Sequence, residues 1–213
     1  MSALSLPSFN AAASAVFAHP LARPAIATTA LLAGALGLYL RRVLRDPSPL
    51  VTWKSLSALP SWLRRWWFTK LVHLANPFSN TGRVHILSYD FGRASVGVRE
   101  HRSLRNPYRS IHAAELALLG ETAGGLAFLG TLDEKTQRAI PTELNCKYFK
   151  KARGYVVAVA QVDTPARDVK GLDAGAEVRV PVVAQIRQGG ERGEVLAEVT
   201  TVFVLSRKTS KKA

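Results

Sequence analysis

The chain has 213 residues, enough for one folded domain and a sizeable extra segment. Apolar residues make up 47% and charged residues 21%, which excludes a disordered, a collagen-like or a polytopic membrane protein. The net charge of +14 indicates contact with a polyanion, whether nucleic acid, anionic lipid or a phosphorylated small molecule. The single cysteine, Cys146, excludes an internal disulfide framework and a cysteine-based zinc site, and it fits a reducing compartment.

The first third of the chain is distinguished by its charge. Residues 1–82 contain one acidic side chain, Asp46, against eight basic ones, and residues 24–40 carry no charge at all. A helix over residues 24–40 would be roughly 26 Å long, close to the ~30 Å of a bilayer core if flanking arginines snorkel. We therefore expect a membrane anchor. The arginines that follow it, at 41, 42 and 45, would keep the folded domain on the cytosolic side.

Two alternatives to the anchor stay open. Residues 1–22 are rich in Ser and Ala and lack acids, which is typical of a mitochondrial presequence, although they contain no arginine. A buried helix of a soluble domain is the other alternative, because Ala, Gly and Thr outnumber Leu and Ile in residues 24–40.

All four tryptophans lie between Trp53 and Trp67, among the basic residues Lys54, Arg64, Arg65 and Lys70. Aromatic and basic side chains together suit a membrane interface. The apolar residues of 62–74 also recur at helical spacing, so that this helix could pack its rings on the domain. The two interpretations are compatible.

The next segment predicts a hairpin followed by a helix. Residues 84–89 and 94–98 alternate as two short strands around the turn at 90–92. Residues 111–129 predict a helix, with Ser110 as its N-cap. Apolar residues surround most of this helix, so we expect other elements to enclose it.

The C-terminal part alternates with period two, which predicts four strands that are antiparallel neighbours. The four strands are 143–149, 154–162, 177–188 and 195–205. Together these elements predict an α+β fold in which a sheet of about six antiparallel strands wraps around a central helix. The domain boundaries that we expect are 1–49 for the targeting or anchor segment, 50–82 for a Trp-rich basic helical linker, 83–206 for the α+β domain and 207–213 for a basic tail.

The segment Asn106-Pro-Tyr-Arg-Ser-Ile-His-Ala-Ala-Glu-Leu-Ala-Leu-Leu-Gly-Glu-Thr-Ala-Gly-Gly125 resembles the hotdog-fold thioesterases, most closely the phenylacetyl-CoA thioesterase-like branch. The resemblance covers about residues 62–206 and implies the hotdog fold. It also implies that Asn106, His112 and Glu121 form an acyl-CoA site, where the acid activates water or attacks the thioester directly while the helix start polarises the carbonyl. Two departures could narrow the site or abolish turnover: the usual His-Gly-Gly is His112-Ala113-Ala114, and Arg109 replaces a frequent Gly.

Glu121 is a candidate general base from its surroundings alone. Its helical neighbours are apolar or small, so the carboxyl group should be poorly solvated, and desolvation raises a carboxyl pKa. The alternative is a structural carboxylate that accepts a hydrogen bond in the core. Glu115, one turn beyond His112, is predicted to be structural.

His112 and Glu121 are nine residues apart and so lie on opposite sides of one helix. The site therefore has to be assembled between chains, which predicts a homodimer or a dimer of dimers. At the helix start the backbone N–H groups of His112 and Ala113 are expected to stabilise an oxyanion.

Further residues suit substrate binding. Gly124 and Gly125 would leave room for an acyl chain, and the basic residues Arg109, Lys147, Lys150 and Arg153 suit the phosphates of CoA, although such a charge cluster can equally be a solvated face. No motif indicates a metal, a cofactor or specific nucleic-acid binding. The predicted function is an acyl-CoA thioesterase that releases a free acid and CoA. The alternative is an inactive hotdog module that binds acyl-CoA or lipid as a membrane scaffold.

Overall fold

The computed structural model describes residues 48–166, 169, 172 and 176–208, together with scattered positions between 24 and 41. The chain divides into two units, Met1–Pro47 and Ser48–Ala213. In the first unit the described positions are helical, and Thr28 Oγ1 donates to Pro24 O at 2.8 Å. None of the helices in the described part of the chain is long and apolar enough to cross a bilayer. More than half of the predicted anchor at 24–40 lies outside the described residues, as does the end of the basic tail, and the anchor stays a prediction.

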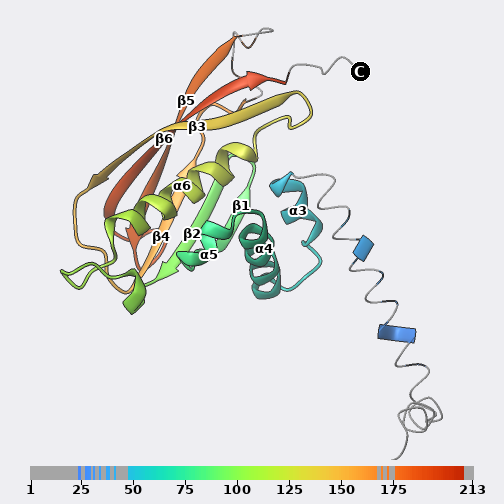
Figure 1. The fold of residues 1–213 in the computed structure, drawn as a ribbon, viewed down its shortest axis with the longest axis horizontal. Helices are drawn as coiled ribbons and strands as arrows, with labels where there is room; N and C mark the ends of the chain where they lie inside the picture. Colours follow the sequence, from blue (N-terminus) through green and yellow to red (C-terminus); the bar gives the residue numbers. More distant parts are fainter. Residues whose placement is uncertain are drawn as a thin grey trace, which may run out of the picture. The chain divides into compact units, whose positions relative to one another are not determined.

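The second unit is built on one antiparallel sheet of six strands, as the sequence predicted (Figure 1). The strands are β1 (His85–Asp90), β2 (Arg93–Arg99), β3 (Gln137–Tyr148), β4 (Tyr155–Gln161), β5 (Glu177–Gln188) and β6 (Val195–Arg207). Their order across the sheet is β1-β2-β4-β5-β6-β3.

The predicted pairing of the last four strands is confirmed for β4 with β5 and for β5 with β6. It is wrong for β3 and β4, which are not neighbours. The turn at Gly189, whose φ is 75°, closes β5 and β6 into a hairpin, and only the outer edge of β6 is left for β3. The strand β3 therefore lies at the edge of the sheet, and β4 pairs with β2 in its middle.

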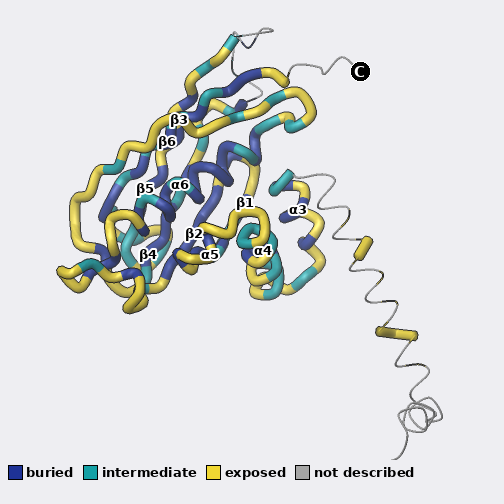
Figure 2. The backbone as a smooth tube through the Cα atoms, in the orientation of Figure 1, coloured by how far each residue is buried: buried dark blue, intermediate teal, exposed yellow. Residues whose placement is uncertain are grey.

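The helix α6 (Ala113–Leu129) crosses the inner face of this sheet, with contacts to β2, β4, β5 and β6 (Figure 1). Leu119, Ala123 and Phe128 are fully buried against the strands. A Cβ at Gly120 would overlap the side chain of Val199, so glycine allows α6 to approach β6 closely. Figure 2 shows α6 as the most deeply buried helix of the unit.

The predicted N-cap of this helix is wrong by two residues. His112 is the N-cap, and its Nδ1 accepts from Ala114 N at 3.1 Å. Ser110 instead donates its hydroxyl to Asn106 Oδ1 at 3.2 Å in the preceding loop. Both side chains can accept from a backbone amide, and the loop decides which of them caps the helix.

Three helices precede the sheet and belong to the same unit: α3 (Pro49–Ser55), α4 (Ser61–Ala75) and α5 (Pro77–Thr81). They pack beside β1, where Phe68 of α4 stacks on Tyr89 at 5.6 Å and meets Trp53 at 5.1 Å. The tryptophans are thereby divided, since Trp53 is buried and Trp62 and Trp66 are exposed. A short 3-10 helix, η1 (Arg102–Leu104), leads into the loop before α6.

Candidate functional site

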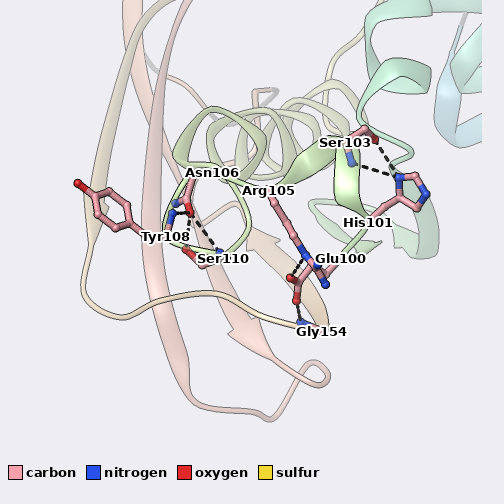
Figure 3. A network of polar contacts seen from close by, with 8 residues as sticks. All are labelled: Glu100, His101, Ser103, Arg105, Asn106, Tyr108, Ser110 and Gly154. Carbon is pink, nitrogen blue, oxygen red and sulfur yellow. Dashed lines mark hydrogen bonds and ion pairs between the residues drawn. The ribbon is translucent and has the colours of Figure 1, made fainter.

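The loop 106–110 that leads into α6 is organised by Asn106. Its Oδ1 accepts from Tyr108 N at 3.0 Å, from Ser110 N at 3.1 Å and from the Ser110 hydroxyl (Figure 3). Arg109 lies in the left-handed region with a φ of 56°, which glycine adopts more readily than arginine. Because Oδ1 is saturated, the Nδ2 amide is the part of Asn106 that can reach a ligand.

The same loop is tied to the sheet through Glu100. This carboxylate accepts from Arg105 Nε at 2.5 Å and from Gly154 N at 2.6 Å (Figure 3). The hydrogen bond from Gly154 and then the Arg105 guanidinium hold the pKa of Glu100 below its ordinary value. The loop start is therefore anchored to the segment that joins β3 and β4.

The start of α6 leaves one backbone donor free. His112 N donates to Leu104 O at 2.8 Å, so this amide is not available as the predicted oxyanion donor. Ala114 N is capped by the His112 ring, and Glu115 N donates to His112 O. Ala113 N has no acceptor among the described residues. The positive end of the helix thus presents the Ala113 N–H, and the His112 side chain serves as a cap.

A groove of about 280 Å³ opens beside this amide. Tyr148, at the end of β3, donates its hydroxyl to Ala113 O at 3.1 Å. Burial, followed by the neighbouring Cys146, raises the pKa of Tyr148 to about 12, so the phenol stays protonated. The groove is lined by Asn106, Ser110, Ile111, Ala113, Leu116, Tyr148, Phe149, Lys150, Lys151 and Ala152. Nothing in the local sequence marks Tyr148 as part of a site, because its place depends on where β3 ends against α6, whereas Lys151 belongs to the basic cluster of Lys150 and Arg153.

Glu121 lies in the middle of α6 and does not line the groove. Ala113, Ala117 and Glu121, four residues apart, form a partly open stripe on a helix that is otherwise mostly buried. Among the described residues Glu121 has no hydrogen-bond or ion-pair partner, and burial raises its pKa above the ordinary value. This environment is the one that the sequence predicted for a general base.

The second acidic residue of α6, Glu115, lies in a closed environment. Its side chain is buried, Oε1 has no hydrogen-bond partner, and burial raises the pKa to about 7. A Cβ at Gly82 would lie 2.7 Å from Oε1, so the backbone at the end of α5 covers this carboxyl group. Glu115 was predicted to be structural, and it has no ion-pair partner among the described residues.

The predicted substrate-binding residues are not all equally placed for that role. Lys150 forms an ion pair with Glu194, and Lys147 lies 3.8 Å from Glu198, whereas Arg109 and Arg153 are exposed around the groove. A Cβ added at Gly124 would lie 3.6 Å from Val182 on the sheet, and a Cβ added at Gly125 would lie 3.9 Å from the Glu121 carboxylate. No cluster of metal-binding side chains occurs in the described part of the chain.

The edge strand β3 carries an open apolar face next to this stripe of α6. Leu144, Cys146 and Tyr148 share their side of the sheet with buried residues of β6, to which they are paired. Yet Leu144 is 48% exposed and Tyr148 is 47% exposed. The other edge strand, β1, is flanked by α4. An uncovered edge strand of twelve residues with apolar side chains exposed on one face is a surface that proteins normally pair or protect.

Comparison with known proteins gives one family and a common fold. The model of a domain of unknown function, DUF4442, matches residues 64–203. A Pseudomonas aeruginosa protein of unknown function, described as a probable thioesterase, is 23% identical, with a TM-score of 0.57 over 70% of this chain and 97% of that one. A thioesterase family protein from Silicibacter pomeroyi is 17% identical, with a TM-score of 0.53 over 66% and 96%. No curated protein matches.

The PaaI protein of the E. coli phenylacetic acid degradation operon is also similar in structure, at 17% identity and a TM-score of 0.48 over 66% of this chain and 97% of that one. The predicted resemblance to the hotdog-fold thioesterases is confirmed. Identities this low establish a common fold and leave the chemistry to be argued from the site.

Proposed function

This chain belongs to the DUF4442 family, and we propose that it is an acyl-CoA thioesterase whose site is completed by a second copy of the chain. One observation carries the proposal: Glu121 is half-buried with no partner in the described part of the chain, its pKa is raised, and it lies on the open stripe of α6. The free Ala113 amide at the start of the same helix supplies the second catalytic group. Cofactors and metals have no role in this proposal.

The distance along the helix requires two chains. Glu121 follows Ala113 by eight residues, which is about 12 Å of helix. An oxyanion donor must lie within about 3 Å of the thioester oxygen, and a general base must reach the same carbonyl through one water molecule. A separation of that length along one helix is too large for both. Glu121 of one protomer and Ala113 of its partner would therefore form each site, and a symmetric dimer would contain two such sites.

The register of this dimer follows from the contacts of Tyr148. Its bond to Ala113 puts the end of β3 level with the start of α6, and β3 runs back along the helix. About 12 Å of strand is three to four residues, so Glu121 is level with about Leu144. Antiparallel pairing of two β3 strands that sets Leu144 opposite the partner's Tyr148 is centred on Cys146. This pairing would also cover the open apolar edge.

The chemistry then needs a water molecule beside the thioester. Glu121 takes a proton as the water oxygen bonds to the carbonyl carbon, and the oxyanion is stabilised by the Ala113 N–H and the helix dipole. When the intermediate collapses, the C–S bond breaks, the CoA sulfur takes the proton, and the free acid leaves. The protonated Tyr148 holds the Ala113 peptide in place through its carbonyl.

Hydrolysis of a panel of acyl-CoA thioesters by wild type, Glu121→Gln and Glu121→Asp tests the proposal. We expect Glu121→Gln to lower kcat/KM by about 10²–10⁴-fold and Glu121→Asp to keep part of the activity. In wild type the rate should rise with pH through a pKa above that of an ordinary carboxyl group, because only the ionised base accepts a proton. Glu177→Gln, at the exposed start of β5, is the matched control.

Turnover that survives Glu121→Gln contradicts this assignment. Calorimetric binding of acyl-CoA without any turnover in wild type contradicts it as well and would instead indicate an inactive binding module.

A further inference from the structure

We propose that the outer side of α4 is a docking surface for an anionic lipid bilayer. The surface consists of the aromatic and aliphatic side chains Trp62, Trp66, Leu74 and Phe78 with the cations Arg65 and Lys70. It lies outside the groove and the Glu121 stripe, so it is independent of the proposed hydrolase activity.

The apolar residues of this surface are exposed although they are large. Trp62 is 69% exposed and Trp66 is 50% exposed, and Leu74 and Phe78 are each 67% exposed. Positions 62, 66, 70 and 74 are four residues apart, so they follow one stripe that winds slowly around α4. In Figure 2 the helix is mostly yellow and teal, in contrast to the dark blue of α6. Three large apolar side chains along one stripe of α4, with Phe78 exposed on the neighbouring α5, mark an interaction site.

Contacts of the second half of α4 fix this helix on the sheet. Phe68 is fully buried against Tyr89 and Trp53. Thr69 Oγ1 accepts from Ile86 N at 2.9 Å, and His73 Nε2 lies 2.7 Å from Val84 O. These contacts join α4 to β1 and the residue before it, and Trp62 and Trp66, nearer the start of the helix, stay exposed.

The positive charge around the stripe indicates an anionic binding partner. Residues 47–89 contain no acidic side chain. Arg65 and Lys70 are exposed between the apolar residues, and Lys70 Nζ lies 5.9 Å from the centre of the Trp66 ring. Tryptophan rings flanked by basic side chains are the combination that binds at the headgroup level of an anionic leaflet.

The same charges disfavour the other occupants. A second copy on this face would set Arg65 and Lys70 against cations of their own kind, which opposes association. The segment Met1–Pro47 would also bring an excess of positive charge, since it contains Arg23, Arg41, Arg42 and Arg45 against Asp46. An anionic bilayer is complementary in charge as well as in polarity.

Quenching of tryptophan fluorescence by brominated lipids tests the proposal on the full chain. Residues 1–47 contain no tryptophan, so their own binding to vesicles does not produce the signal. The vesicles contain equal parts of brominated phosphatidylcholine and phosphatidylserine, and vesicles of brominated phosphatidylcholine alone are the neutral comparison. We expect quenching and a blue shift on the anionic vesicles. In the Trp62→Phe/Trp66→Phe variant the remaining signal, from Trp53 and Trp67, should lose most of the quenching.

The cationic part of the surface is tested by Arg65→Glu/Lys70→Glu. We expect the quenching midpoint to move to at least about tenfold more anionic lipid. Lys135→Glu, an exposed cation before β3, and Val183→Ala, an exposed apolar residue on β5, are the matched controls and should not shift the midpoint.

Absence of quenching on anionic vesicles overturns the proposal, as does quenching that the Trp62→Phe/Trp66→Phe variant retains. If Trp62→Ala/Trp66→Ala lowers the molar mass by light scattering while wild type shows no quenching, a second copy covers this face. If wild type shows no quenching and the Trp62→Ala/Trp66→Ala variant keeps the molar mass of wild type, the surface has no role in docking.

Discussion

Glu121 and Glu115 lie six residues apart on one helix, and burial raises the pKa of both, yet their surroundings assign them to different tasks. Glu121 belongs to a stripe that another molecule can approach. Glu115 is 8% exposed and is closed off by Gly82, so no substrate can reach it. A perturbed pKa therefore indicates a catalytic carboxyl group only where the side chain is also accessible.

Glu115 should make the stability of the fold depend on pH. Its pKa rises from 4.5 to about 7 on folding, so the folded state favours the protonated form. This contribution is fully present below pH 4.5 and is lost as the pH rises through about 7. We expect the free energy of unfolding to fall by roughly 3 kcal/mol across that window. Glu115→Gln, which keeps the shape but cannot ionise, should remove this decline in urea titrations at a series of pH values.

Histidines titrate in the same window, so the readout for Glu115 is the difference between wild type and Glu115→Gln. Burial lowers the pKa of His85, which reduces stability at low pH, the opposite direction, in both proteins. A difference that stays constant from low to neutral pH would show that Glu115 ionises freely in the folded state.

Individual residues were predicted where one helix supplies their surroundings. The half-buried environment of Glu121 follows from its neighbours one helical turn away in each direction, and these residues can be read directly from the sequence. The loss of the His112 amide to Leu104 O could not be predicted, because that bond depends on how η1 meets the loop. Tyr148 was missed for a similar reason, since its partner Ala113 is 35 residues away along the chain.

At the scale of elements, Gly120 limits how closely α6 packs on the sheet. A methyl group there would overlap Val199, whereas at Gly125 it would have one neighbour, at 3.9 Å. We expect Gly120→Ala to destabilise the fold by about 1–2 kcal/mol, because overpacking outweighs the better helix propensity of alanine. Gly125→Ala should stabilise it by up to about 1 kcal/mol. Thermal unfolding of both variants measures the contrast.

The double variant Gly120→Ala/Val199→Ala separates the two causes. Because it removes the overlapping atoms, it should recover the stability that Gly120→Ala loses, relative to Val199→Ala alone. An equal effect of alanine at both glycines would mean that α6 does not approach β6 as closely as the structure has it.

Elements with regular burial were predicted well, and those without it were not. The strands β4, β5 and β6 each bury alternate residues or more, and their predicted limits agree with the structure to within about two residues. The strand β3 begins at Gln137, six residues before its predicted start, because both of its faces are open in the single chain and no alternation marks it. The short helices α3 and α5 contain too few turns to show a period.

At the scale of the whole molecule, the two edges of the sheet differ. Packing of α4 flanks β1, whereas β3 has no neighbour beyond it among the described residues. The apolar face of β3 continues into the partly open stripe of α6, so one surface contains both the strand edge and Glu121. A symmetric contact through this surface would bury the exposed edge and bring two halves of each site together.

Cys146 reports directly on this contact. If two β3 strands pair in the register derived above, Cys146 of one protomer lies opposite Cys146 of its partner, with Cβ atoms about 4.5–5.5 Å apart. The lower end of that range meets the Cβ separation of a disulfide, so oxidation can join the two chains, and a short reagent with two thiol-reactive ends can bridge the whole range. We expect a covalent dimer in wild type and none in Cys146→Ser. In a Cys146→Ser background, Val183→Cys on β5 should also give no covalent dimer, because that exposed residue lies away from the edge.

The variant Leu144→Arg, which charges the apolar face of β3, tests the same contact by disrupting it. It should reduce the molar mass in sedimentation to that of one chain and abolish hydrolysis together with the dimer. A chain that sediments as a monomer, or a dimer that Cys146 fails to cross-link, would contradict the register, and hydrolysis by a monomer would also contradict the shared site.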